Sequence, residues 1–147
     1  MIVRENQITP YHFHWNKMED IINRGGGNLV IRLYNRLPDE QMDTVGDVTA
    51  HLDGRTATLP AGGTVTLTPG ESITLVQGQY HSFWGQAGTG AVMVGEVSRV
   101  NDDHADNRFA VLMIIISNPA NSFNAPCIAG ENVITPPSAP TRKPMTV

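Results

Sequence analysis

The chain has 147 residues, with ten Lys or Arg against 14 Asp or Glu and a formal net charge of −4 at pH 7. This is the length of one ordinary domain, and a charged fraction of only 16% argues against a disordered or coiled-coil protein. The negative charge gives no reason to expect nucleic acid or an anionic membrane as a partner, so a neutral small molecule is the better candidate.

Strand signals run along most of the chain. Residues 29–34 read Leu-Val-Ile-Arg-Leu-Tyr, which is rich in β-branched and aromatic residues, and they follow a glycine triplet at 25–27. Further strands are predicted at 56–59, 64–67, 72–76 and 91–97. The breaks between them contain turn dipeptides such as Asp53-Gly54 and Pro69-Gly70. Short strands at close spacing, with little helical periodicity, predict an all-β antiparallel sandwich or barrel.

The C-terminal region has a different composition. An apolar block at 111–116 is followed by sequence rich in Asn, Ala and Pro. We therefore predict a barrel core over 1–109 and a divergent segment over 110–147, with one more strand and then a Pro-rich flexible tail. The apolar block is too short to cross a bilayer, and no basic and then apolar leader opens the chain. Cys127 is the single cysteine, so no internal disulfide can form, and a cytoplasmic location is predicted.

Four potential metal ligands occur at informative spacings, as His12-x-His14-x4-Glu19 and then Gly78-x2-His81. His12 and His14 are two residues apart, so on a strand both side chains leave the same face. Residues 15–18 are long enough to turn the chain, and an antiparallel return would bring Glu19 back beside the two histidines. His81 must come from a distant strand. Three imidazoles and one carboxylate form a borderline site that can hold Mn, Fe, Co, Ni or Zn.

The same residues resemble the two sequence motifs of the cupins. The first motif is filled at every defined position, as His12-x-His14-x4-Glu19-x6-Gly26. The second follows as Gly70-x5-Val76-x-Gly78-x2-His81. Val76 stands where the family often has proline, and Gly85 where many members have asparagine. The resemblance implies a single double-sheet jelly-roll β-barrel with a metal inside, which agrees with the strand prediction.

Three longer runs, at 4–29, 80–84 and 95–103, resemble the bacterial D-lyxose ketol-isomerase family of cupins. The likeness extends to Phe109. The N-terminal helical segment of larger members has no counterpart here, and 110–147 does not resemble their C-terminus. The resemblance implies an aldose–ketose isomerase for free sugars that depends on one divalent ion, typically Mn²⁺, and it suggests a homodimer. The implied reaction interconverts D-lyxose and D-xylulose, with D-mannose and D-fructose as a second pair.

Two residues are candidates for the acid–base work that isomerisation requires between C1 and C2. Alternation along its strand puts Glu96 on the face of Val92 and Val94, where loss of solvation would make the carboxylate a better base. The alternative for Glu96 is an exposed carboxylate on an edge strand. Lys17 lies two residues before Glu19, a position that looks functional in the family, and its alternative is a solvated turn lysine.

Substrate contacts are predicted at Trp15, Asp106 and Arg108. The loop at 101–108 is dense in groups that bind hydroxyls, although such a run is more often a solvated loop. Trp15 could stack on a sugar or form barrel core. Asp20 is interpreted as structural or substrate-positioning, and Phe83 as barrel core. His51 and His104 are interpreted as non-ligands, and Cys127 as an incidental thiol.

The expected mechanism is ring opening, chelation of O1 and O2, and proton transfer through a cis-enediol, with Lys17 and Glu96 sharing the proton. A metal-mediated hydride shift stays open. Two other functions also stay open: an Fe(II) cupin dioxygenase, which would consume oxygen, and a non-catalytic cupin that binds sugar or metal.

Overall fold

The structure is a computed structural model that describes residues 1–100 and 102–110. These residues form 12 strands and one short helix. In chain order the elements are β1 (Ile2–Val3), β2 (His12–His14), β3 (Glu19–Gly26), β4 (Leu29–Arg36), β5 (Met42–Asp43), β6 (Val48–Leu52), β7 (Arg55–Leu59), β8 (Thr64–Leu67), β9 (Ser72–Leu75), β10 (Tyr80–Gly85), β11 (Val92–Ser98), α1 (Asp103–Asp106) and β12 (Asn107–Phe109). The predicted strand at 111–116, the tail behind it and Cys127 lie outside the described residues, and the division at 109/110 stays a prediction.

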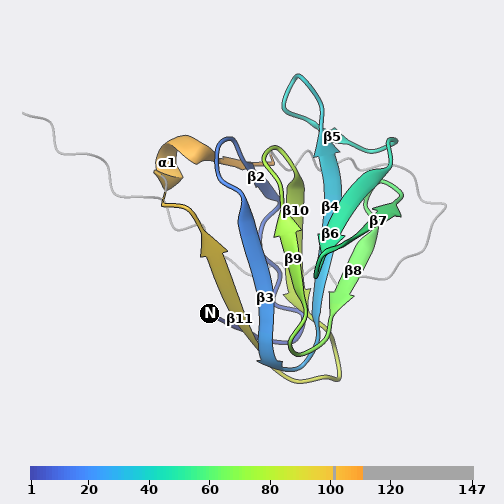
Figure 1. Ribbon diagram of the computed structural model, residues 1–147, viewed down its shortest axis with the longest axis vertical. Coiled ribbons are helices and arrows are strands. Elements are labelled where there is room, and N and C mark those ends of the chain that lie inside the picture. The colour runs from blue at the N-terminus through green and yellow to red at the C-terminus, as the bar shows by residue number, and fades with distance from the viewer. Residues whose placement is uncertain (101, 111–147) are drawn as a thin grey trace, which may run out of the picture. The chain divides into compact units, whose positions relative to one another are not determined.

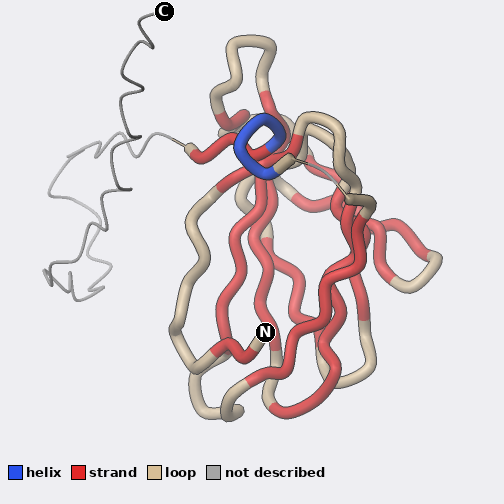
Figure 2. Tube along the Cα trace, turned by 90° about the vertical axis from the view of Figure 1, so that its left-hand side faces the viewer, coloured by secondary structure: helices blue, strands red, loops and turns tan. Residues whose placement is uncertain are grey.

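The strands pair antiparallel in two sheets (Figure 1). Sheet I has the order β1-β11-β3-β9-β6-β7. Sheet II has the order β12-β2-β10-β4-β5, and β8 also pairs with β4. Figure 2 shows strands along most of the described chain, with α1 at one end of them. Strands that are neighbours in a sheet are often far apart in sequence, as in jelly-roll barrels, and this confirms the predicted all-β fold.

The hydrophobic core lies between the two sheets. In sheet II, Leu29, Ile31 and Leu33 alternate along β4 and are fully buried. In sheet I, Ile21 of β3 and Ile73 of β9 face them from paired positions. Full burial of a side chain of this size contributes about 1.5 to 3 kcal/mol, so this layer accounts for much of the stability of the fold.

The glycine that ends the first motif has a steric reason to be there. Gly26 adopts a φ of +90°, in a region that side chains rarely tolerate. A Cβ at this position would lie 2.2 Å from the carbonyl oxygen of Ala91, at the close approach of β3 to β11. Only glycine fits this contact without a shift of the backbone.

The predicted strands at 29–34, 56–59, 64–67, 72–76 and 91–97 correspond to β4, β7, β8, β9 and β11, with ends that differ by at most two residues. The connection after β2 differs from the prediction. Residues 15–18 do not return the chain within one sheet, because β2 pairs with β10 and β12 whereas β3 pairs with β9 and β11. The turn crosses from sheet II to sheet I, so Glu19 faces the histidines from the opposite wall.

Candidate metal centre

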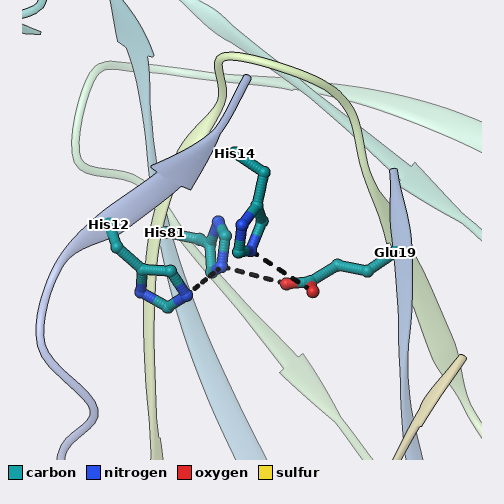
Figure 3. A group of neighbouring side chains, drawn as sticks. All are labelled: His12, His14, Glu19 and His81. Atoms are coloured by element: carbon teal, nitrogen blue, oxygen red, sulfur yellow. Dashed lines mark hydrogen bonds and ion pairs between the residues drawn. The ribbon is translucent and has the colours of Figure 1, made fainter. Parts of the chain in front are cut away.

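Four side chains from three strands meet between the sheets (Figure 3). His12 and His14 come from β2, and His81 comes from the neighbouring strand β10, in direct register with His12. Glu19 is the first residue of β3, on the other sheet. One potential ligand atom from each of the four lies within 4.8 Å of the others, a spacing that allows all four to bind one ion.

The three histidines present the same ring nitrogen to the centre. Each Nδ1 points away and lies at hydrogen-bond distance from an oxygen: Pro10 O at 2.9 Å for His12, Asn107 Oδ1 at 2.7 Å for His14, and Gln79 O at 3.0 Å for His81. An oxygen acceptor requires a proton on Nδ1. The lone pair of a neutral imidazole is then on Nε2, the nitrogen that faces the centre. These contacts are the kind that orient histidine ligands around a metal.

The inner nitrogens are poorly satisfied without a cation. Nε2 of His81 lies 3.1 Å from Nε2 of His12 and 3.1 Å from Glu19 Oε1. With the protons on Nδ1, these contacts set lone pairs against one another. Nε2 of His14 is buried and makes no hydrogen bond of acceptable geometry, although Glu19 Oε2 lies 3.3 Å away. Buried nitrogens left in this way cost free energy, and a bound cation would satisfy all of them together. The donor set therefore fits a divalent ion.

Burial and the neighbouring groups set the charges at the centre. Burial, followed by repulsion from His81, lowers the pKa of His12 from 6.5 to about 4. Burial alone would raise the pKa of Glu19, but His14 and His81, when protonated on both ring nitrogens, direct a proton at its carboxylate and hold this pKa well below its usual range. At neutral pH the centre therefore offers a neutral His12 and an anionic Glu19, which are the ligand forms that bind metal.

A lysine links the centre to a second carboxylate. Lys17 is buried, with Nζ 3.0 Å from Glu19 Oε2 and 3.2 Å from Glu96 Oε1. Burial alone would lower the pKa of Lys17, but Glu19 and Glu96 offset burial and raise this pKa above its ordinary value. A buried ammonium paired with two carboxylates thus lies beside the four potential ligands.

These groups open onto a cavity of about 280 Å³. Its lining combines the site residues with apolar side chains, namely Met1, Thr9, Pro10, His12, His14, Lys17, Glu19, Phe83, Glu96, Asn107 and Phe109. A volume at the lower end of the usual range for ligand pockets suits a small molecule.

Comparisons with known proteins identify the family. Residues 1–118 match the model of the D-lyxose isomerase family. The chain belongs to the D-lyxose isomerase family. It is similar to the D-lyxose/D-mannose isomerase of Escherichia coli O157:H7, with 56% identity over 109 residues, covering 74% of this chain and 48% of that protein. It is also similar to the D-lyxose/D-mannose isomerase of Serratia proteamaculans, with 56% identity over 110 residues, 74% of this chain and 47% of that protein. The chain thus spans about half the length of the curated relatives it matches.

Glu96 faces the cavity of this D-lyxose isomerase family member, as alternation along β11 predicts, but it is less enclosed than expected. Val92 and Val94 are buried on the same face of β11, whereas the side chain of Glu96 keeps 35% exposure. The reason is that β11 leaves the core towards its end. The carboxylate of Glu96 is therefore paired with Lys17 and is not enclosed by apolar side chains.

Trp15 does not line the cavity. It packs against Phe13, with ring centroids 5.0 Å apart, and Arg36 lies over its ring at 4.7 Å. Phe13 alternates with His12 and His14 along β2, and Trp15, directly after the strand, packs on the side of Phe13. The structure therefore gives Trp15 a packing position, the second of the two interpretations of this residue.

Asp106 and Arg108 also lie away from the cavity lining. Asp106 is buried behind His14, where Oδ1 accepts a hydrogen bond from the backbone N–H of Asn16 at 2.6 Å and Oδ2 accepts one from that of Lys17 at 3.2 Å. Burial would raise the pKa of Asp106, but these hydrogen bonds lower it overall. Arg108 is half exposed, and its Nε lies 3.5 Å from Glu40 Oε2.

Asn107 and Phe109 line the cavity, and the sequence did not predict either of them. They alternate along the chain with Asp106 and Arg108, which were predicted. Asn107 contacts His14, and the ring of Phe109 lies 5.5 Å from that of His12. In β12 these positions pair directly with His14 and His12, whereas Arg108 pairs with Phe13. The signal was the alternation itself. Alternation identifies the residues that face the cavity only when the first residue of the strand is known. Because α1 ends directly before β12, the sequence does not show where β12 begins.

Phe83 is a core residue that also touches the cavity, and Asp20 accepts a hydrogen bond from Thr74 Oγ1 at 2.5 Å, away from the centre. His51 on β6 and His104 on α1 lie outside the group of potential ligands found among the described residues. In the described part of the chain, no helix is long and apolar enough to span a membrane.

Proposed function

We propose that this chain is a metal-dependent aldose–ketose isomerase that interconverts D-lyxose and D-xylulose, with D-mannose and D-fructose as a second pair. The observation that carries the proposal is the convergence of three inward Nε2 lone pairs and the Glu19 carboxylate beside the Lys17–Glu96 pair. The names of the two relatives support the sugars. Since the chain spans about half of those relatives, the activity has to be tested on this chain itself.

The proposed metal ligands are His12, His14, Glu19 and His81, and the proposed ion is Mn²⁺. Three nitrogens and one carboxylate oxygen form a borderline donor set, and such a set accepts manganese among other first-row ions. When bound, the ion would supply Lewis acidity that polarises the carbonyl of the open-chain sugar.

Lys17 and Glu96 are proposed to move the proton between C1 and C2. Glu96 carries an accessible carboxylate at the cavity, as a base needs, and Lys17 holds its proton and is placed to donate it to a sugar oxygen. The 3.2 Å contact between them lets the proton that leaves carbon be shared within one pair. The proposed route is a cis-enediol.

The cavity favours a free sugar over a phosphorylated one. Among the described residues that line it, Lys17 has the one positively charged side chain, and its ammonium is already paired with Glu19 and Glu96. The N-terminal ammonium of Met1 donates to the carbonyl oxygen of Val94. A phosphate group would find no unpaired cationic side chain in this lining. The homodimer and the cytoplasmic location stay predictions that rest on the resemblance and on the single cysteine.

The proposal is tested by an isomerase assay on the purified chain reconstituted with MnCl₂. We expect D-lyxose and D-xylulose to interconvert. When D-xylulose is converted in deuterium oxide, we expect deuterium at C2 of the aldose, because a proton that leaves carbon exchanges with solvent. Full retention of protium would replace the enediol by a hydride shift. Absence of conversion for both sugar pairs at full metal occupancy would contradict the isomerase, and oxygen uptake by the iron-loaded chain would indicate a dioxygenase.

A further inference from the structure

The three potential histidine ligands differ in what holds them. His12 and His81 are held by backbone carbonyl oxygens of Pro10 and Gln79, which lie two residues earlier in the chain. A carbonyl can only accept a hydrogen bond, so these two imidazoles have no alternative arrangement. His14 is held by a side chain, the amide of Asn107, which is 93 residues away in sequence. Of the three, His14 alone depends on a side chain from another strand.

The geometry points to Asn107 as the positioning residue of the centre: its amide oxygen fixes the proton of His14 on Nδ1 and so presents the Nε2 lone pair to the metal. This inference rests on the proposed function, in which His14 is a ligand. It concerns a residue outside the predicted site, and it acts through His14 and not by contact with the sugar or the ion.

The strand pairing places Asn107 for this role. Asn107 is the first residue of β12 and the direct partner of His14 across β2, so both side chains leave the same face of sheet II. Asn107 Oδ1 lies 2.7 Å from His14 Nδ1, a short distance for a hydrogen bond between neutral groups. The side chain is half-buried, which limits the water that could replace it.

An amide can also donate a hydrogen bond, and the surroundings decide which of its ends faces the ring. Asp106 Oδ2 lies 4.0 Å from the same His14 Nδ1. This carboxylate is held in place by the backbone N–H groups of Asn16 and Lys17. A negative oxygen on this side favours a proton on Nδ1, and that proton in turn favours the oxygen end of Asn107. The reverse arrangement would put the proton on Nε2 and block metal binding.

Two variants of Asn107 separate its acceptor function from its bulk. Asn107→Leu keeps the size but removes the acceptor, whereas Asn107→Asp keeps an acceptor oxygen and cannot donate. The matched control is Arg108→Ala, on the same strand but on the outer face, where the side chain is half exposed. His12 and His81 act as internal controls in every variant, because backbone carbonyls hold them.

The first readout needs no metal. In the chelator-treated chain, the long-range ¹⁵N–¹H NMR correlations of the imidazoles report which ring nitrogen carries the proton. We expect His14 to be protonated on Nδ1 in the unchanged chain and in Asn107→Asp, and to lose this preference in Asn107→Leu. His12 and His81 should keep theirs in all variants, and their unchanged signals show that the leucine variant is folded.

The second readout is the affinity for MnCl₂, measured by calorimetry. Loss of the partner of a histidine ligand weakens metal binding by about 10- to 100-fold, and this is the loss expected for Asn107→Leu. Asn107→Asp should bind at least as tightly as the unchanged chain, and Arg108→Ala should bind equally. An unchanged His14 tautomer in Asn107→Leu would overturn the inference, and so would unchanged Mn²⁺ affinity in a chain that binds the ion.

The outcomes keep the two proposals apart. If the unchanged chain binds no Mn²⁺, the proposed function fails, but the NMR measurement still decides what Asn107 does to His14. If the chain binds Mn²⁺ and isomerises sugar, and Asn107→Leu matches it in both readouts, the proposed function stands and the role of Asn107 falls.

Discussion

Sheet II and sheet I bring unlike chemistry to the cavity. Sheet II supplies three imidazoles, each with Nδ1 against an oxygen, so their donor atoms are held in place. Sheet I and the turn before it supply charged groups that are tied mainly to one another, namely Glu19, Lys17 and Glu96. In the proposed function, sheet II therefore serves mainly metal binding, and sheet I with the turn before it serves mainly proton movement. Glu19 contributes to both roles, because its carboxylate faces the histidines and contacts Lys17.

The largest expected effect comes from removing a ligand of sheet II. In His81→Ala, Mn²⁺ affinity should fall by more than about 100-fold and isomerisation should be lost, since the ion would keep three of four protein ligands. Metal content after gel filtration and the rate with D-lyxose measure this. The matched control is His51→Ala, on β6 outside the centre, which should keep both. Equal losses in the two variants would contradict the assignment.

The next effect separates the two walls. In Glu96→Gln the rate constant kcat should fall by about 10²- to 10⁴-fold, the usual contribution of an acid–base group, while Mn²⁺ affinity stays unchanged. The substitution keeps the shape and removes the charge that pairs with Lys17. Loss of metal together with rate would place Glu96 among the ligands and end the distinction between the walls.

A smaller effect concerns the support of the turn between the sheets. In Asp106→Ala two backbone N–H groups, those of Asn16 and Lys17, lose a charged acceptor. We expect the free energy of unfolding to fall by about 2 to 3 kcal/mol, measured by urea denaturation of the metal-free chain. Arg108→Ala removes a half-exposed ion pair and should cost less than about 1 kcal/mol. A similar small cost for Asp106→Ala would show that the turn does not need its carboxylate.

The smallest effect is a pH dependence of the metal-free chain. Because the pKa of His12 is lowered from 6.5 to about 4, the unfolded chain binds this proton more readily than the folded one. The stabilisation from His12 is therefore present above pH 6.5, begins to decrease near that pH, and is lost as the pH falls towards 4. Between pH 7 and pH 6 the expected loss is about 0.7 kcal/mol. The thermal unfolding of His12→Gln should lack this component, and an equal pH slope in both chains would contradict it.

The sequence was sufficient for the fold class and for the convergence of the four potential ligands. Spacing alone placed His12 and His14 on one strand face, and the second motif added His81 from a distant strand. It could not show that Glu19 crosses to the other sheet, since four turn residues permit either a hairpin or a crossing. Which of the two forms depends on the partners of β3, which are β9 and β11.

The substrate end was harder to predict because alternation needs a known starting point. Asp106 and Arg108 were chosen for their chemistry, but β12 begins at residue 107, so Asn107 and Phe109 face the cavity instead. For Trp15 the starting point was available. The rule that placed His12 and His14 together also places residue 15 on the opposite face, where its ring packs against Phe13 and Arg36.

The most direct test of the account is a titration of the metal-free chain with MnCl₂, in which bound Mn²⁺ and the rate of D-lyxose isomerisation are measured on the same samples. The account predicts one bound ion per chain and a rate that rises in proportion to occupancy. A chain that binds one ion tightly and does not isomerise at any occupancy would contradict it, and so would a rate that persists after the metal is removed.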